Sequence, residues 1–328
     1  MDNRIDEILQ QYPLKIVSQK RIRGAVMLCT ENGTYIAKIY EGSKKRLCFQ
    51  SIVQNKLLDD GYELIDAIVE NSEGGLSCKD NRGNEWIVKR WYQGEECNIR
   101  DTKEVCLAAE HMAGLHNHMI VDTEDICCEK YDLHETFSKH NKEMKRVHTY
   151  IKDKKQKNDM EIKLLNSYSM FYSQGEEAVR VLDDSGYRRL RDESVSMKLV
   201  LHGNYTYHNI LFRDDRIVTT GFDKCAVGVQ IIDLYDFIRK VMEKNVWEID
   251  MGLKVIDSYC NKRKPSKAEC QVLYTLLIYP EKYWKLINFY YNSKKTWMST
   301  KNYEKLYKIC EQEKYRAEFI KAVGGLLA

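Results

Sequence analysis

The feature of this sequence that most constrains the fold is a change in residue patterning near residue 93. Before that point, short apolar runs alternate with polar residues and are separated by turn signals such as the Asn-Gly pair at residues 32–33. This pattern is typical of antiparallel strands joined by hairpins. One helix is predicted over residues 44–60, because Gly61 follows it as a stop signal. We therefore predict an α+β protein whose residues 1–93 form a small, antiparallel, β-rich lobe.

The rest of the chain, residues 94–328, reads mostly as helices and is predicted to form a larger helical lobe. An apolar stripe at helical spacing runs through residues 105–116. Residues 134–160 are strongly charged and rich in lysine, which is typical of a solvated helix or a helix-to-helix crossing; a basic docking surface is the alternative. Residues 197–223 are the strand-like, turn-rich part of this half.

Composition excludes several classes of function. The chain has 52 basic and 49 acidic residues, so its net charge of +3 does not indicate binding to nucleic acid. No apolar run is typical of a signal peptide or a membrane span, and we expect a protein made and kept in a cytoplasm. The 11 cysteines include no CxxC pair, which argues against a zinc site and predicts buried free thiols in a reducing compartment.

Two short segments carry the chemical signal. Residues 202–209 read HGNYTYHN, and residues 221–225 read GFDKC. A β-rich lobe followed by a helical lobe with HGxxxxxN is the layout of a protein-kinase-like fold. In such a site a strand lysine, held by a helical acid, binds the nucleotide phosphates. A loop aspartate accepts the hydroxyl proton, and an asparagine and a second aspartate hold Mg²⁺ through oxygen ligands.

On these residues the chain resembles the aminoglycoside phosphotransferase and choline kinase superfamily. Within that superfamily it is most similar to the CotS-type spore coat proteins. The resemblance covers nearly the whole chain and implies a two-lobed, protein-kinase-like fold. The segments that carry it are YIAKIY at 35–40, LAAEHMAGLH at 107–116, HGNYTYHNILF at 202–212, GFDKC at 221–225, QIIDLYDFIRKVMEKNVW at 230–247 and YPEKYWKLINFYYNSKKTW at 279–297.

The resemblance implies roles for the first lobe. Lys38 matches the phosphate-binding lysine, and its alternating strand context fits that role; an ordinary exposed lysine on an edge strand is the alternative. The helical acid that would hold this lysine is expected near position 50. Gln50 stands there, with Gln54 one turn later, and neither side chain can form an ion pair with Lys38.

The resemblance also implies roles in the second lobe. His202 matches the loop histidine, which is usually an architectural hydrogen-bonding residue of the catalytic loop. Asn209 matches the metal-binding asparagine, and a helix or turn cap is its alternative role. Asp233 matches the acid that opens the next long helix and braces the loop.

Two acids that the chemistry needs are missing. Asn204 stands at the position of the catalytic base, and an amide cannot accept a proton at useful pH. Gly221 stands at the position of the metal-binding aspartate. Asp223 lies two residues later, and residues two apart in a strand point to the same side. Asp223 would therefore partly substitute as a metal ligand if the strand were displaced by one pleat.

Three functional hypotheses follow. The first is a catalytically impaired, kinase-like spore coat protein that acts in coat assembly or binding. It would be made in the mother-cell cytoplasm and have other spore coat proteins as partners. The second is an active ATP-dependent phosphotransferase that uses Lys38, Asn209 and Asp223 with ATP and Mg²⁺ as cofactors. The third is a module that holds ATP without Mg²⁺ through Lys38 and the linker near residues 90–93. The missing acids argue against ATP and Mg²⁺ being held in the usual way.

Overall fold

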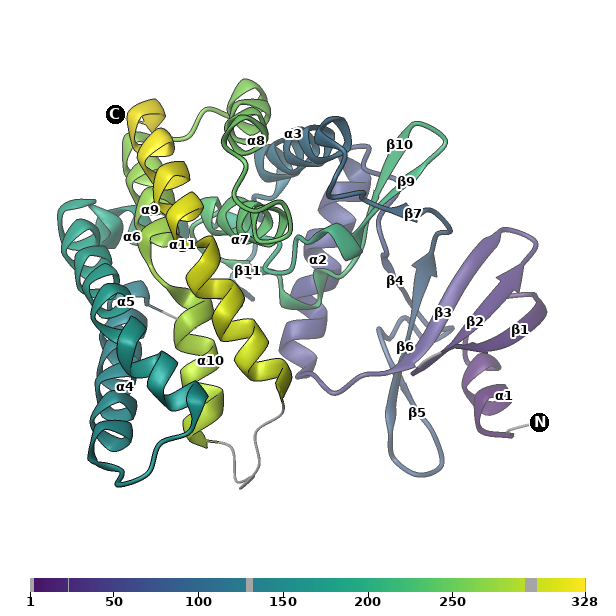
Figure 1. Ribbon diagram of the computed structural model, residues 1–328. Coiled ribbons are helices and arrows are strands. Elements are labelled where there is room, and N and C mark those ends of the chain that lie inside the picture. The colour runs from purple at the N-terminus through teal and green to yellow at the C-terminus, as the bar shows by residue number, and fades with distance from the viewer. Residues whose placement is uncertain (1–2, 23, 128–131, 293–299, 328) are drawn as a thin grey trace. The chain divides into compact units, whose positions relative to one another are not determined.

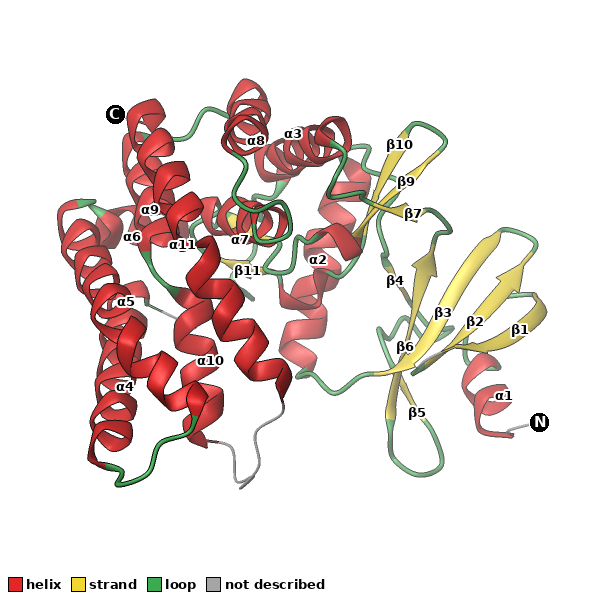
Figure 2. Cartoon of the chain, viewed as in Figure 1, coloured by secondary structure: helices red, strands yellow, loops and turns green. Residues whose placement is uncertain are grey.

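The computed structural model describes residues 3–22, 24–127, 132–292 and 300–327. They form two compact units. Unit 1 combines Met1–Cys128 with Ser194–Asp233, and unit 2 combines Glu129–Glu193 with Leu234–Ala328. All described strands belong to unit 1, whereas unit 2 is helical (Figures 1 and 2). The predicted α+β composition is confirmed, and the lobe boundary near residue 93 stays a prediction.

The elements of unit 1 are a few helices separated by groups of consecutive short strands. They are α1 (Asn3–Leu9), β1 (Ile16–Ile22), β2 (Ala25–Thr30), β3 (Gly33–Ile39), α2 (Lys44–Asp59), β4 (Ile68–Val69), β5 (Cys78–Lys79), β6 (Glu85–Trp91), β7 (Glu95–Glu96), α3 (Thr102–His118), β8 (Val200–Leu201), β9 (Ile210–Arg213), β10 (Arg216–Thr219) and β11 (Ala226–Val227), with 3₁₀ turns η1 (Tyr207–Asn209) and η2 (Phe222–Lys224).

The main sheet of unit 1 has the order β1-β2-β3-β6-β4, with β5 also paired to β6, and every pairing is antiparallel. In the register of β3 and β6, Lys38 lies opposite Ile87 and Ile36 lies opposite Lys89. Directly opposed residues share a face, and so do residues two apart along one strand. Lys38 and Lys89 therefore emerge from the same face of the sheet.

The two faces of this sheet are covered by different helices. On one face α1 packs against an apolar cluster whose members are Ile5, Ile8, Leu9, Tyr12, Val26, Leu28, Ala37, Cys78 and Val88 (Figure 1). On the other face Leu47 of α2 packs against Ile68 and Ile87. Because Ile87 lies opposite Lys38, the face that carries the two lysines is the one that α2 covers. The alternating strand context predicted for Lys38 is confirmed, because Ala37 faces the α1 cluster whereas Lys38 faces α2.

The two motif segments lie in the turns of two smaller sheets. Strand β9 pairs with β10 and β7, and β8 pairs with β11. Residues 202–209 connect β8 to β9, and residues 220–225 connect β10 to β11. Each segment therefore connects one of the two small sheets to the other, within the strand-like, turn-rich region predicted near residues 197–223.

Unit 2 is built from helices. They are α4 (Leu133–Asp153), α5 (Asp159–Asp184), α6 (Tyr187–Ser196), α7 (Ile231–Met242), α8 (Ile249–Lys262), α9 (Lys267–Ile278), α10 (Glu281–Asn292) and α11 (Thr300–Leu327), of which α6 ends and α7 begins within unit 1. Helices α5 and α6 are separated at Gly186, whose φ of 69° is left-handed.

The charged run at residues 134–160 forms α4 and the start of α5. Helix α4 buries one stripe and exposes its lysine-rich side, and the buried residues are Leu133, Phe137, Asn141, Met144, Val147 and Ile151. A capping box between Asn158 and Glu161 begins α5. The interpretation as a solvated helix is confirmed, and the docking-surface alternative stays a prediction.

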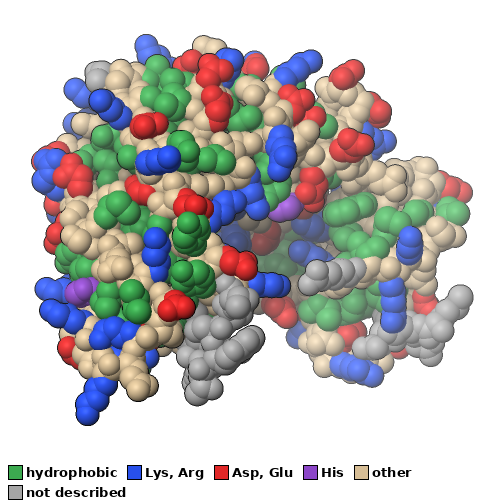
Figure 3. All heavy atoms as spheres, viewed as in Figure 1, with side chains coloured by type: hydrophobic (Ala, Val, Ile, Leu, Met, Phe, Trp, Pro, Cys, Tyr) green, Lys and Arg blue, Asp and Glu red, His purple; other side chains and the backbone are tan. Residues whose placement is uncertain are grey.

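The surface and the cysteines bear on the expectations from composition. On the face drawn in Figure 3, acidic and basic side chains are interspersed rather than gathered by sign. No described helix has the length and apolarity to cross a membrane.

The ten described cysteines are free thiols, but only Cys78, Cys97 and Cys225 are buried, so the expectation that most are buried is wrong. Cys128 and residues 293–297 of the coat-protein resemblance lie outside the described residues.

Candidate functional site

The loop after β8 is held by a single buried carboxylate. Asp233 accepts hydrogen bonds from the backbone N–H of His202 at 2.6 Å and of Gly203 at 2.8 Å. The same carboxylate lies 3.1 Å from Nε2 of His116. Gly203 has a left-handed φ of 72°, and a Cβ there would collide with the backbone carbonyl of Lys224. Asp233 therefore braces the loop, as the resemblance implies.

His202 is an architectural residue of this loop. Its Nδ1 accepts a hydrogen bond of 3.2 Å from the backbone N–H of Asn204, so Nε2 carries the ring hydrogen. That Nε2 is buried and has no hydrogen-bond partner among the described residues. Burial lowers the pKa of His202, against the opposing effect of Asp233, so the ring is neutral. A buried neutral ring is not in a position to exchange protons with a substrate.

The two asparagines of the motif contact each other. Nδ2 of Asn209 donates a hydrogen bond of 2.8 Å to the backbone carbonyl of Asn204. The backbone carbonyl of Asn209 accepts one of 2.8 Å from the N–H of Thr220, which ties the loop to the end of β10. The side-chain oxygen of Asn209 has no hydrogen-bond partner among the described residues and is left as an acceptor. The roles predicted for Asn204 and Asn209 stay predictions.

The segment after β10 differs from its sequence-based interpretation. Gly221 has a left-handed φ of 85°, and a Cβ there would lie 2.7 Å from Nδ2 of Asn209. Residues 222–224 form the 3₁₀ turn η2 rather than a strand. Strand alternation does not apply to a turn, so it gives no direction for the side chain of Asp223, and the metal role predicted for Asp223 stays a prediction. The backbone carbonyl of Asp223 instead accepts a hydrogen bond of 3.3 Å from Arg46.

Lys38 is partly buried and makes no ion pair within 4.0 Å with any described residue. Its pKa is lowered, mainly by burial and then by the charge of Lys89. The carboxylates of Asp223 and Asp66 act in the opposite direction and raise the pKa of Lys38, so both lie near its ammonium. The lysine that the resemblance assigns to phosphate binding thus has acids nearby but forms no ion pair with a residue that the structure describes.

The sequence interpretation missed a buried ion pair of this site. Lys89 and Asp66 form an ion pair whose side chains are only 5% and 4% exposed. The same carboxylate accepts hydrogen bonds from the backbone N–H of Gly221 at 3.0 Å and from Nε2 of Gln54 at 3.2 Å. A signal was present, because each charged residue stands inside an apolar strand-like run, where an unpaired charge is costly.

The glutamines of α2 do not form an ion pair with Lys38. Gln54 uses its amide to hold Asp66, and its Oε1 accepts a hydrogen bond of 3.2 Å from the N–H of Ile68. Gln50, one turn earlier on the same side of the helix, is buried, and its Nε2 has no hydrogen-bond partner among the described residues. The cofactor-binding role predicted for Gln50 stays a prediction. We define the candidate site as Lys38, Arg46, Gln50, Asp66, Lys89, Asn204, Asn209, Gly221 and Asp223.

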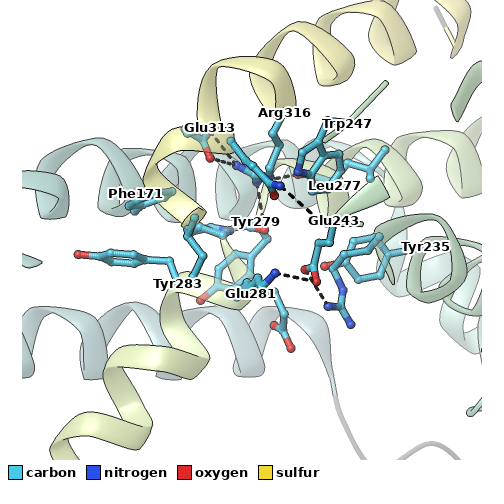
Figure 4. A pocket seen from close by; sticks show the side chains of 15 residues that line it. Phe171, Tyr235, Glu243, Trp247, Leu277, Tyr279, Glu281, Tyr283, Glu313 and Arg316 are labelled. Carbon is cyan, nitrogen blue, oxygen red and sulfur yellow. Dashed lines mark hydrogen bonds and ion pairs between the residues drawn. The ribbon is translucent and has the colours of Figure 1, made fainter. Parts of the chain in front are cut away.

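Unit 2 contains a separate pocket with aromatic and charged walls, which Figure 4 shows from close by. Its carboxylates are all neutralised by cations: Glu313 lies 2.9 Å from Arg316, Glu243 lies 3.0 Å from Lys282 and 3.2 Å from Arg239, and Glu281 lies 2.6 Å from Lys285. Arg316 also donates to the carbonyls at the end of α9, including that of Leu277 at 2.8 Å. The charged side chains of this pocket are therefore explained by ion pairs within unit 2. We keep the candidate site in unit 1.

Comparison with known families gives a direct assignment. The sequence profile of the family described as "Spore coat putative kinase YutH" matches residues 5–323. The chain belongs to this spore coat kinase family. The CotS-type resemblance seen in the sequence is thereby confirmed. No curated protein matches the sequence at a significant level.

Solved structures show which fold this spore coat family member has. An aminoglycoside phosphotransferase from Alicyclobacillus acidocaldarius is 15% identical and has a TM-score of 0.88, with 98% of this chain and 96% of that chain covered. The AMP-bound spectinomycin phosphotransferase is 15% identical at a TM-score of 0.59, covering 97% and 96%. Amicoumacin kinase with AMP-PNP, Ca²⁺ and its ligand is 12% identical at 0.62, covering 96% and 92%. The predicted kinase-like fold is confirmed.

The residues of this spore coat family member do not fit Mg²⁺ in the arrangement that the resemblance implies. No cluster of three or more His, Cys, Asp or Glu side chains suited to a metal occurs in the described part of the chain. Gly221 has no space for a carboxylate beside Asn209, and the carboxylate of Asp66 is occupied by Lys89. Among the described residues of the site, Asp223 and the side-chain oxygen of Asn209 are left as oxygen donors, and Asp223 lies in the turn η2 rather than at the position of the expected acid.

Proposed function

We propose that this protein is a spore-coat-associated, kinase-like protein that is catalytically impaired and acts in coat assembly or binding. The observation that carries the proposal is the state of the two catalytic positions. Asn204 has no carboxylate for a proton, and Gly221 is left-handed and packed against Asn209. The family assignment supports the coat context. Synthesis in the mother-cell cytoplasm and deposition on the spore are part of the same proposal.

The expected loss of activity follows from the chemistry. A missing general base costs about 10²–10⁴-fold in rate. A missing metal carboxylate removes charge stabilisation of the transferring phosphoryl group, worth several kcal/mol. The helical acid is also replaced, by Gln50, so the site has lost three negative charges: the proton acceptor, a metal ligand and the partner of the phosphate-binding lysine. Together these losses leave at most a trace of phosphotransfer.

Two experiments test this proposal. The first measures ADP formation by the purified protein with ATP, Mg²⁺ and a panel of amine, hydroxyl and protein acceptors, next to Asn204→Asp. We expect no turnover in either, because the second acid is still missing; robust turnover by the unaltered protein would overturn the proposed impairment. The second adds fluorescently labelled protein to spores of a strain that lacks it. Failure to bind such spores would count against the coat role.

An active phosphotransferase with a rearranged site is the second candidate. It is favoured by two facts: Asp223 lies near enough to Lys38 to raise its pKa, and the side-chain oxygen of Asn209 has no described partner. This enzyme would depend on Asp223 for metal and on Lys38 for phosphate. Asp223→Asn would then abolish turnover, whereas Asn204→Asp would change little. Equal, negligible activity in all three proteins would dismiss it.

A further inference from the structure

The candidate site lacks three acids that a metal-dependent site would carry. The positions expected to carry acids hold Gln50, Asn204 and Gly221. A divalent cation normally serves to offset both those acids and the phosphates. Where the acids are absent, the repulsion that a phosphate group would meet is smaller from the start. Such a site needs less added positive charge to hold an anion.

The ammonium of Lys89 lies close to the position where the resemblance expects a metal ion. Asp66 is the carboxylate that contacts the backbone N–H of Gly221, at 3.0 Å, and so lies beside the position of the missing metal ligand. Its counter-ion is the ammonium of Lys89, buried to the same degree. Gln54 holds the other carboxylate oxygen at 3.2 Å, which fixes the pair in place. The acid that contacts Gly221 is therefore neutralised by the protein itself.

Lys38 is a cation of this site that remains available to a ligand. It shares a sheet face with Lys89 but has no ion pair within 4.0 Å among the described residues. Lys89 lies near enough to disfavour its charge, so an anion that bound Lys38 would relieve that repulsion. The buried Nε2 of Gln50 is a further donor without a described partner, on the helix that covers this face.

We propose that the candidate site binds the phosphates of a nucleotide without a divalent cation, with Lys38 contacting the phosphate and the Lys89 ammonium in place of the metal at Asp66. The proposal rests on the proposed function, because it deepens the role of the same site. The two are tested by different measurements. The proposed function concerns turnover, whereas this inference concerns only the binding of ATP and its dependence on Mg²⁺. Lys89 is a positioning residue here, since it acts through Asp66 and the local charge.

The test is calorimetric titration of the full-length protein with ATP, in excess EDTA and in excess Mg²⁺. We expect binding in EDTA that Mg²⁺ does not strengthen. Lys38→Met should weaken binding roughly ten- to a hundredfold in both buffers, the effect of losing one charged hydrogen bond. Lys79→Met is the matched control, because Lys79 is an exposed cation on β5 of the same sheet. The affinity of this variant for ATP should equal that of the unaltered protein.

Variants of the buried pair separate a metal substitute from a mere structural contact. Lys89→Met leaves Asp66 without its cation, so ATP should bind poorly in EDTA and recover in Mg²⁺. Asp66→Asn should bind ATP at least as tightly in EDTA, because Lys89 is no longer neutralised. The double variant Asp66→Asn with Lys89→Met should bind like the unaltered protein, and it guards against misfolding of either single variant. Equal metal dependence in all four proteins would overturn the role of Lys89.

The remaining outcomes separate this inference from the proposed function. ATP binding that requires Mg²⁺ in the unaltered protein overturns the inference, while absence of turnover would still leave the proposed function standing. No ATP binding in either buffer also overturns it. Inorganic tripolyphosphate and adenosine serve as parallel probes: competition by tripolyphosphate supports phosphate recognition, whereas competition by adenosine alone contradicts it.

Discussion

The backbone N–H of Gly221 donates a hydrogen bond of 3.0 Å to the carboxylate of Asp66, which lies 155 positions earlier in the chain. This contact joins the segment after β10 to the entrance of β4, and the parallel bridge between Ile65 and Thr219 continues it. The position where the resemblance expects a metal-binding acid is thus occupied by a glycine that contacts an acid from elsewhere. That acid is already bound by Lys89.

Breaking the buried ion pair should destabilise the protein strongly. Lys89→Met leaves the carboxylate of Asp66 buried without its counter-ion, at a cost of about 3–5 kcal/mol in the free energy of unfolding. Replacing both partners, as Asp66→Asn with Lys89→Met, should recover most of that loss, because no charge is left buried. Urea unfolding measures both, with exposed Lys79→Met as the control. A single variant as stable as the control would show that the pair does not contribute.

Substitution of Gly221 should cost more than its backbone conformation alone explains. Gly221→Ala meets a left-handed φ of 85° and a contact of 2.7 Å with Asn209. Gly83→Ala is a matched control, because Gly83 has a φ of 82° and nothing lies within 4 Å of the position that a Cβ would take there. The control should lose about 1–2 kcal/mol of unfolding free energy, the strain of a left-handed residue. Gly221→Ala should lose more unfolding free energy than this control, and adding Asn209→Ala to it should remove the difference. Equal losses at both glycines would contradict the steric argument.

Removing the charge that braces the loop should weaken folding. Asp233→Asn places an amide N–H where the carboxylate now accepts from the backbone of His202 or Gly203. We expect a loss of about 1.5–3 kcal/mol in the free energy of unfolding, the range for hydrogen bonds to charged groups. Asp236→Asn on the same helix is the control, because its pair with Arg239 is 39% exposed on the acid side and surface pairs contribute little. Similar unfolding midpoints for the two variants would refute the brace.

The free energy of unfolding should decrease as the pH is lowered below neutrality. Burial lowers the pKa of His111 from its ordinary value of 6.5 to about 4, and it lowers the pKa of His202 as well. In the unfolded chain these rings take up protons near pH 6.5, whereas the folded protein does so only at lower pH. The stabilisation is therefore complete above pH 6.5 and is lost as the pH falls toward 4.

A variant of His111 tests this linkage. Nε2 of His111 lies 2.9 Å from the hydroxyl of Thr219, and His111→Gln keeps a hydrogen-bonding group at that place without a titrating ring. The loss of unfolding free energy between pH 7 and pH 4 should shrink by roughly 1–3 kcal/mol in this variant. His118→Gln is the control, because the side chain of His118 is 44% exposed. An unchanged pH profile in His111→Gln would exclude His111 as a source of the acid sensitivity.

Local patterns in the sequence determined much of this protein. Alternation at residues 34–40 defined the strand that carries Lys38, and Gly61 marked the end of α2. The spacing HGxxxxxN located the loop of His202 and Asn209. The sequence alone also showed that positions 204 and 221 carry Asn and Gly in place of acids. These features are local, because strand periodicity, helix stops and short loops depend on neighbouring residues.

Tertiary structure alone decided how the charges of the site are arranged. Asp66 and Lys89 meet only because antiparallel pairing sets β4 beside β6, and Gly221 reaches Asp66 only through the contact of β10 with the approach to β4. The turn at Asp223 was also hidden, since strand alternation predicts direction only while the chain stays extended. A charge buried in the fold must be neutralised by whichever residue the packing brings to it, and sequence spacing does not name that residue.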